Sequence, residues 1–404
     1  MIRDAATTII GAGAVGCAVA YHLARDGWRD VQVVDARDVA EATTAQAAGL
    51  VGQVRSTVER TRLAMASVRL FSRLEAETGY PPDWRQTGSI RIALTDERVA
   101  EFRRMATIAE SAGLETAFLT PEELRDRFPL IDTGTVRAAL WCPTDGYLQP
   151  HSLTTAYSRA ARDLGVTFHP RVTVTGLSVR AGAIDGLRTD AGDVHTELVV
   201  DAAGPWAAAI AAMAGAELPI VPVRHEYFVS TPVAGWSAGL PVLRIPDLRL
   251  YVRAEGSAVL CGGWEAAAVS RDPRSIVRAD AMPVDPDWDV LARFASDLAS
   301  VVASADGVRP SAVFRGWPAF APDGRFVVGP VPGIRGFVMA AACNAHGVSG
   351  SAGLAEHVLE SMGPDPSPYV RSLSPARFMA QPVDWEQAQT RARSVYENYY
   401  AVTP

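Results

Sequence analysis

The stretch TTIIGAGAVG, residues 7–16, decides the fold of this chain. Its first four residues are β-branched and predict a strand, and the apolar pattern that follows predicts an amphipathic helix to about Arg25. Gly11 permits a tight turn, Gly13 lets the backbone approach a pyrophosphate, and Gly16 lets helix and strand pack closely. The free N–H groups and the dipole at the start of such a helix favour an anion. The stretch therefore predicts a dinucleotide-binding turn.

A second predicted strand, residues 31–35, strengthens this interpretation. It ends in Asp35, about two dozen residues after the first glycine, where the ribose of a bound dinucleotide needs a hydrogen-bond acceptor. An acid at this position would repel the 2′-phosphate of NADP. FAD and NAD remain, beside the alternative of a nucleotide-free turn with a solvent-facing Asp35.

The chain after Asp35 does not continue as a second mononucleotide-binding half, which an NAD dehydrogenase would normally have. A Thr/Ala/Gly loop at residues 43–50 precedes a long helix expected over residues 58–78. A strand near residues 88–94 and a charged helix over residues 96–112 follow. The dinucleotide turn is thus expected in a discontinuous domain.

Later segments return to the same domain. Residues 198–206, LVVDAAGPW, indicate a buried strand that turns through Gly204 into an alanine-rich helix. Residues 219–263 are rich in β-type residues with repeated Gly and Pro, which favours an antiparallel sheet. Residues 322–348 predict a further strand, a turn and the start of a helix.

We therefore expect an α/β (α+β) fold with a discontinuous Rossmann-like nucleotide domain and a second, mainly antiparallel-sheet substrate domain. The nucleotide domain is expected to comprise residues 1–79, 143–218 and 311–370. The substrate domain is expected to comprise residues 80–142 and 219–310, and residues 371–404 form a C-terminal tail.

Composition narrows the class of protein. With 404 residues, 48% hydrophobic and 21% charged, the chain has the balance of a globular protein with a large core. A net charge of −7 without a long Lys/Arg run argues against a nucleic-acid partner. No apolar run reaches membrane-spanning length, and no secretory leader is evident, so we expect a cytoplasmic protein with no membrane partner. The four isolated cysteines predict buried free thiols and no metal site.

Taken together, these segments resemble the D-amino-acid-oxidase-like flavoprotein family, most closely its dimethylglycine and sarcosine dehydrogenase branch, which is similar to sarcosine and glycine oxidases. The matching motifs include IIGAGAVG, AAGLVGQVRS, QTGSIRIALT, DGYLQPHSLT, VVDAAGPWA, PVRHEYFVSTP, FAPDGRFVVG and NAHGVSGSAG. The resemblance implies FAD stretched across the nucleotide domain, with substrate between the flavin and an antiparallel sheet. It also implies oxidation of N-alkylated glycines.

Two departures from that branch bear on the cofactor and on partners. The branch usually carries a flavin-linked histidine where this chain has Gln46, and residues 315–318 read RGWP where sarcosine oxidases have a tethering cysteine. An amide cannot form that bond, so we expect non-covalent FAD. The chain also stops where many relatives continue into a folate-binding module, and no folate coupling is expected.

The resemblance and the motif spacing together predict the residues that contact FAD. They are Gly11, Gly13, Ala14, Val15, Gly16, Asp35, Ala36, Thr43, Thr44, Gln46, Ala47, Ala48, Gly49, Leu50, Val172, Ala202, Ala203, Gly204, Trp206, Gly316, Asn344, His346, Gly347, Val348 and Ser349.

Four residues are candidates for the substrate side. The ordinary pKa of a histidine side chain suits His225 to accept a proton from an ammonium group. The alternative is a histidine whose ring only hydrogen-bonds to neighbouring backbone groups. Tyr251 and Arg253 alternate on a predicted strand, so both face one side and could bind a carboxylate, unless that side is merely exposed. Arg55 is a second candidate anchor for a carboxylate, or it is a solvated arginine.

His346 lies where the last helix is expected to begin. The N–H groups at that helix start could stabilise negative charge on a reduced flavin. The alternative is that His346 is only a turn residue.

The expected function is FAD-dependent oxidation of the C–N bond of a small amino acid or N-substituted glycine, by hydride transfer to the flavin N5 and hydrolysis of the resulting imine. Oxygen is a candidate electron acceptor, and the partner is otherwise a small-molecule substrate. Two other classes stay open, a catalytically silent regulatory protein of the same fold and an NAD-dependent dehydrogenase.

Overall fold

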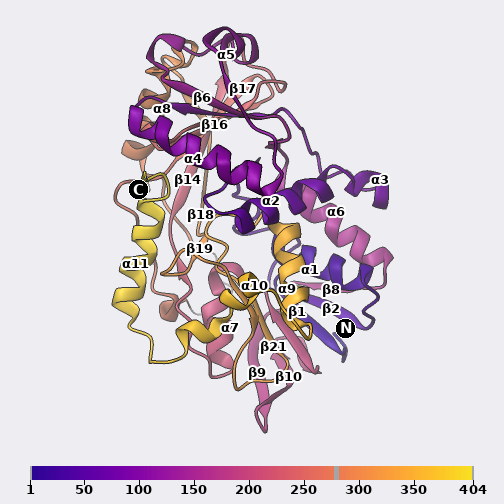
Figure 1. Ribbon diagram of the computed structural model, residues 1–404. Coiled ribbons are helices and arrows are strands. Elements are labelled where there is room, and N and C mark those ends of the chain that lie inside the picture. The colour runs from indigo at the N-terminus through magenta and orange to yellow at the C-terminus, as the bar shows by residue number, and fades with distance from the viewer. Residues whose placement is uncertain (1, 277–281, 403–404) are drawn as a thin grey trace.

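A computed structural model describes residues 2–276 and 282–402 (Figure 1). Two large sheets dominate it, one in the lower half of Figure 1 and one in the upper half. Of the expected ranges, residue 1, residues 277–281 and residues 403–404 lie outside the described part. Every other expected segment can be placed.

The lower sheet has six strands, and β1 lies near its centre between strands from distant parts of the chain. β1 pairs in parallel with β12 and β2, so Thr7 lies opposite Leu198 on one side and Val31 on the other. All pairs are parallel except β20 with β21. The strand order is β20 (Val327–Pro330), β21 (Phe337–Ala341), β12 (Leu198–Asp201), β1 (Thr7–Ile10), β2 (Val31–Asp35) and β8 (Thr167–Pro170).

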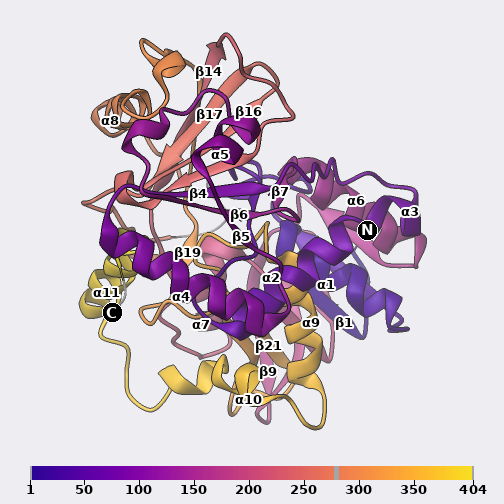
Figure 2. The ribbon, with the colours of Figure 1, turned by 45° about the horizontal axis from the view of Figure 1, so that its top comes forward.

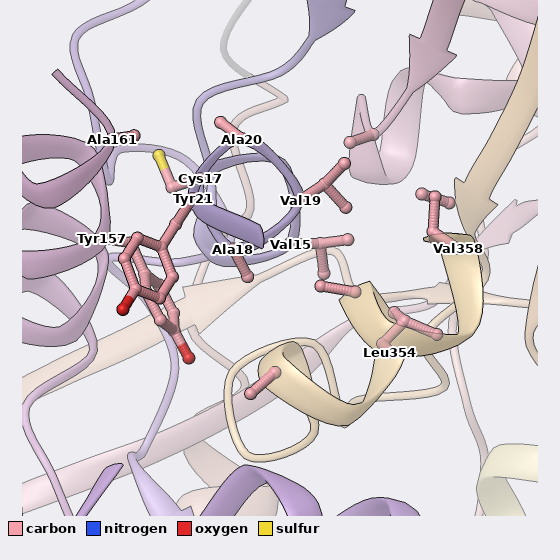
Figure 3. Packing of buried hydrophobic residues seen from close by; sticks show 14 of the residues in the cluster. Val15, Cys17, Ala18, Val19, Ala20, Tyr21, Tyr157, Ala161, Leu354 and Val358 are labelled. Atoms are coloured by element: carbon pink, nitrogen blue, oxygen red, sulfur yellow. The ribbon is translucent and has the colours of Figure 1, made fainter. Parts of the chain in front are cut away.

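Three helices cover one face of this sheet: α1 (Ala14–Arg25), α6 (Pro150–Asp163) and α9 (Ser351–Met362). Figure 3 shows α1 between its neighbours, with Tyr21 against Tyr157 of α6 on one side and Leu354 of α9 on the other. The two tyrosine rings stack with centroids 6.0 Å apart. The opposite face is covered by α7 (Ala207–Met213) and a sheet of β9 (Val174–Arg180), β10 (Ala183–Thr189) and β11 (Gly192–His195).

The upper sheet has eight strands and is antiparallel apart from the β15–β4 pair, which is parallel. The strand order is β18 (Pro310–Gly316), β14 (His225–Pro232), β17 (Ala258–Gly263), β16 (Leu250–Glu255), β15 (Val242–Ile245), β4 (Ser89–Ala93), β6 (Ala138–Cys142) and β5 (Ala117–Leu119). The α/β class with a second, mainly antiparallel sheet is therefore confirmed.

The two faces of the upper sheet have different neighbours. α5 (Pro121–Arg127) and α8 (Trp288–Ala299) lie beside the upper sheet (Figure 2). Their apolar side chains pack on one face of that sheet. On the other face, Tyr251 packs with Ala48 and Leu50 of the loop that follows β2. The upper sheet thus meets the nucleotide domain through the loop expected at residues 43–50.

α4 (Asp96–Ala112) and α2 (Val58–Phe71) connect the two halves, and they contact each other. The single helix expected over residues 58–78 is wrong, because α2 ends at Phe71 and α3 (Leu74–Thr78) begins separately. The side chains of Ser72 and Arg73 both bond to the carbonyl of Arg69, and the Arg73 N–H turns to Leu70 instead. This competition for one carbonyl interrupts the helix.

Two further expectations are corrected. Pairing with β14 assigns β18 to the upper sheet, so the boundary expected at residue 311 falls inside a strand. The last helix begins at Ser351 rather than at His346. Ala342, Asn344 and Ala345 have positive φ, which a helix does not allow, so a loop leads from β21 to α9.

The segment expected as a tail, residues 371–404, begins inside α10 (Pro368–Ser372) and carries α11 (Trp385–Glu397), which runs along the left edge of Figure 1. α11 packs on the short sheet of β13 (Val221–Pro222) and β19 (Ala319–Phe320). A second short sheet joins β3 (Leu50–Val51) to β7 (Gly146–Tyr147).

The sequence predicted buried free thiols and no membrane-spanning segment. All four cysteines are free thiols, and three of them are buried. Among the residues that the structure describes, no helix combines the length and apolar character needed to span a bilayer.

Candidate active site

One cavity extends from the glycine turn after β1 to the face of the upper sheet. Its lining includes Gly11 and Asp35 at the nucleotide end, and His225 and Tyr251 of the upper sheet. Arg55, which follows β3, lines the same cavity. The two regions expected from sequence to bind cofactor and substrate therefore open into one space.

Close backbone contacts explain the glycines of the turn. Gly11 has φ of +110°, and a Cβ there would lie 2.5 Å from the carbonyl oxygen of Ala202. A Cβ on Gly16 would lie 1.9 Å from the carbonyl oxygen of Gly11. Neither position accepts a side chain, because these contacts are with backbone atoms that cannot move away independently.

The start of α1 is open to an anion. Gly13 is the N-cap residue and provides no side-chain cap, while Thr44 accepts a hydrogen bond from the N–H of Ala14 at 3.1 Å. The other N–H groups of the first turn have no partner within the helix, so they can bind a phosphate. Gly13, Ala14 and Val15 all line the cavity.

Asp35, at the end of β2, lies beside the glycine turn. Its two carboxylate oxygens accept hydrogen bonds from the N–H groups of Ala12 at 2.6 Å and Arg37 at 2.7 Å. Burial raises the pKa of this carboxyl above its ordinary value, and these two hydrogen bonds oppose that rise. Asp35 lines the cavity, and each oxygen can accept a further hydrogen bond, so the residues present fit an adenine dinucleotide.

Most residues expected to contact FAD line this cavity, and two do not. Gly16 faces the Gly11 carbonyl, as described above. The side chain of Asn344 accepts a hydrogen bond from the N–H of Ala321 and donates one to the carbonyl of Ala342. The expected residues that line the cavity are Gly11, Gly13, Ala14, Val15, Asp35, Ala36, Thr43, Thr44, Gln46, Ala47, Ala48, Gly49, Leu50, Val172, Ala202, Ala203, Gly204, Trp206, Gly316, His346, Gly347, Val348 and Ser349.

His225 is held between two tyrosines. Its Nε2 lies 2.7 Å from the hydroxyl of Tyr251 and its Nδ1 lies 2.9 Å from the hydroxyl of Tyr396 in α11. Burial lowers the pKa of His225 to about 4, so the ring is neutral at pH 7. A neutral imidazole has one donor and one acceptor nitrogen, so this pair of contacts fixes the orientation of both hydroxyl groups.

The two candidate arginines, Arg55 and Arg253, differ in their contacts and in whether they line the cavity. Arg55 lines the cavity and has no hydrogen bond or ion pair within residues 2–276 and 282–402. Arg253 is 2% exposed and does not line the cavity. Its guanidinium donates to the carbonyls of Ala48 and Ala254 and pairs with Glu255 at 2.6 Å. The alternation on β16 places Tyr251 and Arg253 on one face, but only Tyr251 reaches the cavity.

His346 also lies in the cavity wall, in the loop before α9. Its Nε2 is 2.9 Å from the hydroxyl of Tyr399, and its Nδ1 is buried without a partner in the described structure. Burial lowers the pKa of His346 well below its ordinary value, and the charges of Arg55 and Arg244 lower it further. The ring of Tyr399 stacks on Trp264 at 3.8 Å.

Sequence reasoning missed Arg244 and Tyr399, which both line the cavity. Arg244 is a charged residue inside the buried strand β15, and that interruption was a usable signal. Tyr399 comes from the C-terminal segment and carried no local signal. Trp264 also lines the cavity, whereas Trp317 does not, and its indole N–H donates to the carbonyl of Met282.

Comparison with known proteins agrees with this geometry. The model of the family described as FAD dependent oxidoreductase (DAO) matches residues 7–361. Mitochondrial dimethylglycine dehydrogenase of Rattus norvegicus is 33% identical over 348 residues, which cover 83% of this chain and 40% of that protein. The 4-methylaminobutanoate oxidase (formaldehyde-forming) of Paenarthrobacter nicotinovorans is 29% identical over 361 residues, which cover 88% of this chain and 43% of that protein.

A solved structure extends the likeness to nearly the whole chain. L-proline dehydrogenase from P. horikoshii superposes with a TM-score of 0.84 at 25% identity, covering 94% of this chain and 98% of that chain. By contrast, the chain spans about two-fifths of the length of the two curated relatives. The family match over residues 7–361 and the identity with the first relative show that the chain belongs to the family of FAD-dependent oxidoreductases.

Proposed function

We propose that this chain oxidises the C–N bond of an amine that carries a carboxylate, with FAD as the immediate acceptor. The observation that carries the proposal is the single cavity that joins the glycine turn to His225, Tyr251 and Arg55. A dinucleotide seated on the turn would extend toward these residues. The similar proteins named above act, by their names, on N-methylated or cyclic amino acids, which supports the same substrate class.

When bound, FAD would take up the hydrogen and two electrons of the substrate C–H bond next to nitrogen. The C–N bond becomes a double bond, the nitrogen releases a proton, and water hydrolyses the imine to an amine and a carbonyl compound. Arg55 would bind the substrate carboxylate, because its guanidinium faces the cavity without a partner in the described structure. This contact would aim the substrate toward the cofactor.

His225 and Tyr251 would orient the substrate nitrogen. A histidine with a pKa of about 4 holds a proton poorly at pH 7, so we assign His225 the task of positioning the Tyr251 hydroxyl rather than storing the substrate proton. The Tyr251 hydroxyl lies at the cavity, where it can contact the amine. Arg253 is not assigned a substrate contact, because Glu255 and two carbonyls already occupy its guanidinium.

We further propose that FAD is bound without a covalent link. The side chain of Gln46 lies at the cavity, and its oxygen accepts a hydrogen bond from the N–H of Arg315 at 3.2 Å. The carboxamide has no nucleophilic nitrogen to bond to a flavin. Acid precipitation of the yellow protein should release all the colour into the supernatant, and colour retained in the pellet would contradict the proposal.

The function is tested by anaerobic titration of the FAD-loaded protein with N-substituted glycines and proline, with flavin absorbance as the signal. Bleaching by at least one amine is expected, and Arg55→Met should slow it at least tenfold, because the contact that aims the substrate carboxylate and amine toward the cofactor is lost. A protein that binds FAD but is not bleached by any carboxylate-bearing amine would support the regulatory alternative. Peroxide formation under air, compared with reduction of an artificial dye, then identifies the electron acceptor.

A further inference from the structure

Three arginines gather at the substrate end of the molecule without ion pairs. Arg55 follows β3, Arg91 lies in β4 and Arg244 lies in β15. Arg91 and Arg244 are each 7% exposed, and the parallel pairing of β4 with β15 sets them directly opposite each other. Like charges opposite each other in a sheet are destabilising. No ion pair involves any of the three within residues 2–276 and 282–402.

Neutral groups supply the few contacts that these arginines have. Arg91 donates to the carbonyl of Val54 at 2.9 Å, and Arg244 donates through Nη1 to the hydroxyl of Tyr400 at 3.2 Å. The Nε of Arg244 is buried with no partner in the described structure. Arg55 has no protein partner there at all.

The charge of the Asp145 carboxylate acts to raise the pKa of all three arginines, but its oxygens already bond to other groups. Its oxygens accept hydrogen bonds from the backbone and side chain of Gln53 and from the hydroxyl of Ser89. Three guanidinium charges against one carboxylate leave an excess of two positive charges. A buried charge without a counter-charge costs several kcal/mol, so the site is prepared for an anionic ligand.

The pKa values of Arg55 and Tyr399 reflect the same excess of positive charge. Burial lowers the pKa of Arg55 to about 10, and the charges of Arg244 and Arg91 contribute to the fall. Burial alone would raise the pKa of Tyr399, but these arginines lower it below its ordinary value.

Two of the three arginines open into the cavity from different parts of the fold. Arg55 comes from the segment between β3 and α2, and Arg244 comes from the upper sheet. Arg91 does not line the cavity, but its charge contributes to the lowered pKa of Arg55. The cavity therefore offers two separate guanidinium groups, each with free donors.

We infer that the substrate is an amine with two carboxylates, one bound by Arg55 and the other by Arg244. This inference rests on the proposed function and names its substrate class, for example an amino acid that carries an N-carboxymethyl group. A single carboxylate would leave one positive charge buried without compensation. A second carboxylate removes that charge and fills the free donors of Arg244.

Binding of unreactive acids tests the inference without any amine chemistry. The FAD-loaded protein is titrated with succinate against butyrate and with glutarate against valerate, and the change in the flavin spectrum is followed. Each dicarboxylate should bind at least tenfold more tightly than its matched monocarboxylate, as expected for one additional charge-assisted contact. Equal affinities within both pairs would overturn the inference.

Substitutions locate the second carboxylate. Arg244→Met and Arg55→Met should each reduce the preference for succinate over butyrate to less than twofold, while the affinity for butyrate changes little because one arginine remains. Arg103→Met, on the exposed side of α4, is the control and should keep the full preference. If both cavity variants weaken butyrate and succinate equally, the two arginines share one carboxylate and the inference fails.

The two proposals can fail separately. If sarcosine bleaches the flavin as well as iminodiacetate does, and dicarboxylates show no preference, the amine oxidation stands and the two-carboxylate inference falls. If no amine bleaches the flavin but succinate still binds more tightly than butyrate, the dianion site stands and the proposed oxidation falls.

Discussion

At the residue scale, the glycine turn shows how one missing side chain decides a fold. Gly16 lies in the first turn of α1, where alanine would ordinarily stabilise a helix by about 1 kcal/mol. The Gly11 carbonyl lies 1.9 Å from the position of a Cβ, and that overlap outweighs the propensity. The steric overlap of an alanine Cβ would therefore cost more free energy than the helix would gain from alanine.

We expect Gly16→Ala to lower the free energy of unfolding by roughly 1–3 kcal/mol and to weaken FAD binding, since the strand and α1 must separate. Urea unfolding of the cofactor-free protein and FAD titration measure the two effects. Gly239→Ala is the matched control, because a Cβ there meets no atom of the described residues within 4 Å. A Gly16 variant as stable as the control would contradict the packing argument.

Asp201, at the end of β12, gives a prediction about pH. One carboxylate oxygen accepts a hydrogen bond from the N–H of Ala203 at 3.0 Å, and the other is buried without a partner in the described structure. Burial raises the pKa of Asp201 from 3.8 to about 8. Between these values the unfolded chain is ionised while the folded protein keeps its proton, so ionisation favours unfolding as the pH rises.

Asp201→Asn keeps the shape and the acceptor but removes the titration. The variant should therefore gain stability relative to wild type as the pH rises from about 4 to about 8, at a slope of up to about 1.4 kcal/mol per pH unit. Urea unfolding of both proteins at pH 5 and pH 8 gives the difference. A stability difference that is the same at both pH values would show that Asp201 ionises normally in the folded state.

At the scale of elements, α1 is stabilised from both sides. It contacts α6 through the stacked Tyr21 and Tyr157 and contacts α9 through side chains that include Leu354 (Figure 3). α1 itself has no charged residue in its first turn and no side-chain cap. Packing on neighbouring helices therefore holds α1 in place, and it leaves the N-terminus free to bind an anion.

Leu354→Ala should remove 2–5 kcal/mol from the free energy of unfolding, because Leu354 is 1% exposed and its loss leaves a cavity between two helices. Leu164→Ala, at a position that is 43% exposed, should change stability by less than about 0.5 kcal/mol. Urea unfolding at pH 7 compares the two. Equal losses would mean that α9 does not support α1.

At the scale of the whole molecule, the C-terminal segment completes the site. Tyr396 reaches His225, Tyr399 reaches His346, and Tyr400 reaches Arg244. The segment is fastened to the upper half by Arg98 of α4, which donates to the Tyr400 carbonyl at 2.7 Å and to Asp247 at 3.1 Å. A single buried arginine therefore connects α4, the upper sheet and the end of the described chain.

Arg98→Met should cost about 1–3 kcal/mol in stability, since it removes the charged partner of Asp247, whose side chain is 13% exposed and keeps hydrogen bonds from Leu94 and Thr95. The loss should appear first as faster amide exchange in residues 396–402, measured by hydrogen–deuterium exchange. Arg125→Met is the control, because its pair with Glu122 is exposed and contributes little. Unchanged exchange in the C-terminal segment would show that other contacts fasten it.

The sequence predicted those parts of the fold whose signal is local. β1, β2 and α4 have the expected positions, because β-branched runs, a terminal acid and an amphipathic period act over a few residues. The helix over residues 58–78 was wrong where side chains competed for one carbonyl, at Ser72 and Arg73. The helix start expected at His346 was wrong because three residues before it adopt positive φ.

By itself, the sequence determined the family, the strand, turn and helix that suit a dinucleotide, and the use of FAD. Only the tertiary structure decided which charged side chains meet at the cavity. Alternation gave Tyr251 and Arg253 the same face, yet Arg253 turns to Glu255, whereas Arg244 and Tyr399 reach the cavity from a neighbouring strand and from the chain end. The physical reason is that periodicity fixes the face a residue occupies, while strand order and long-range packing fix what lies opposite that face.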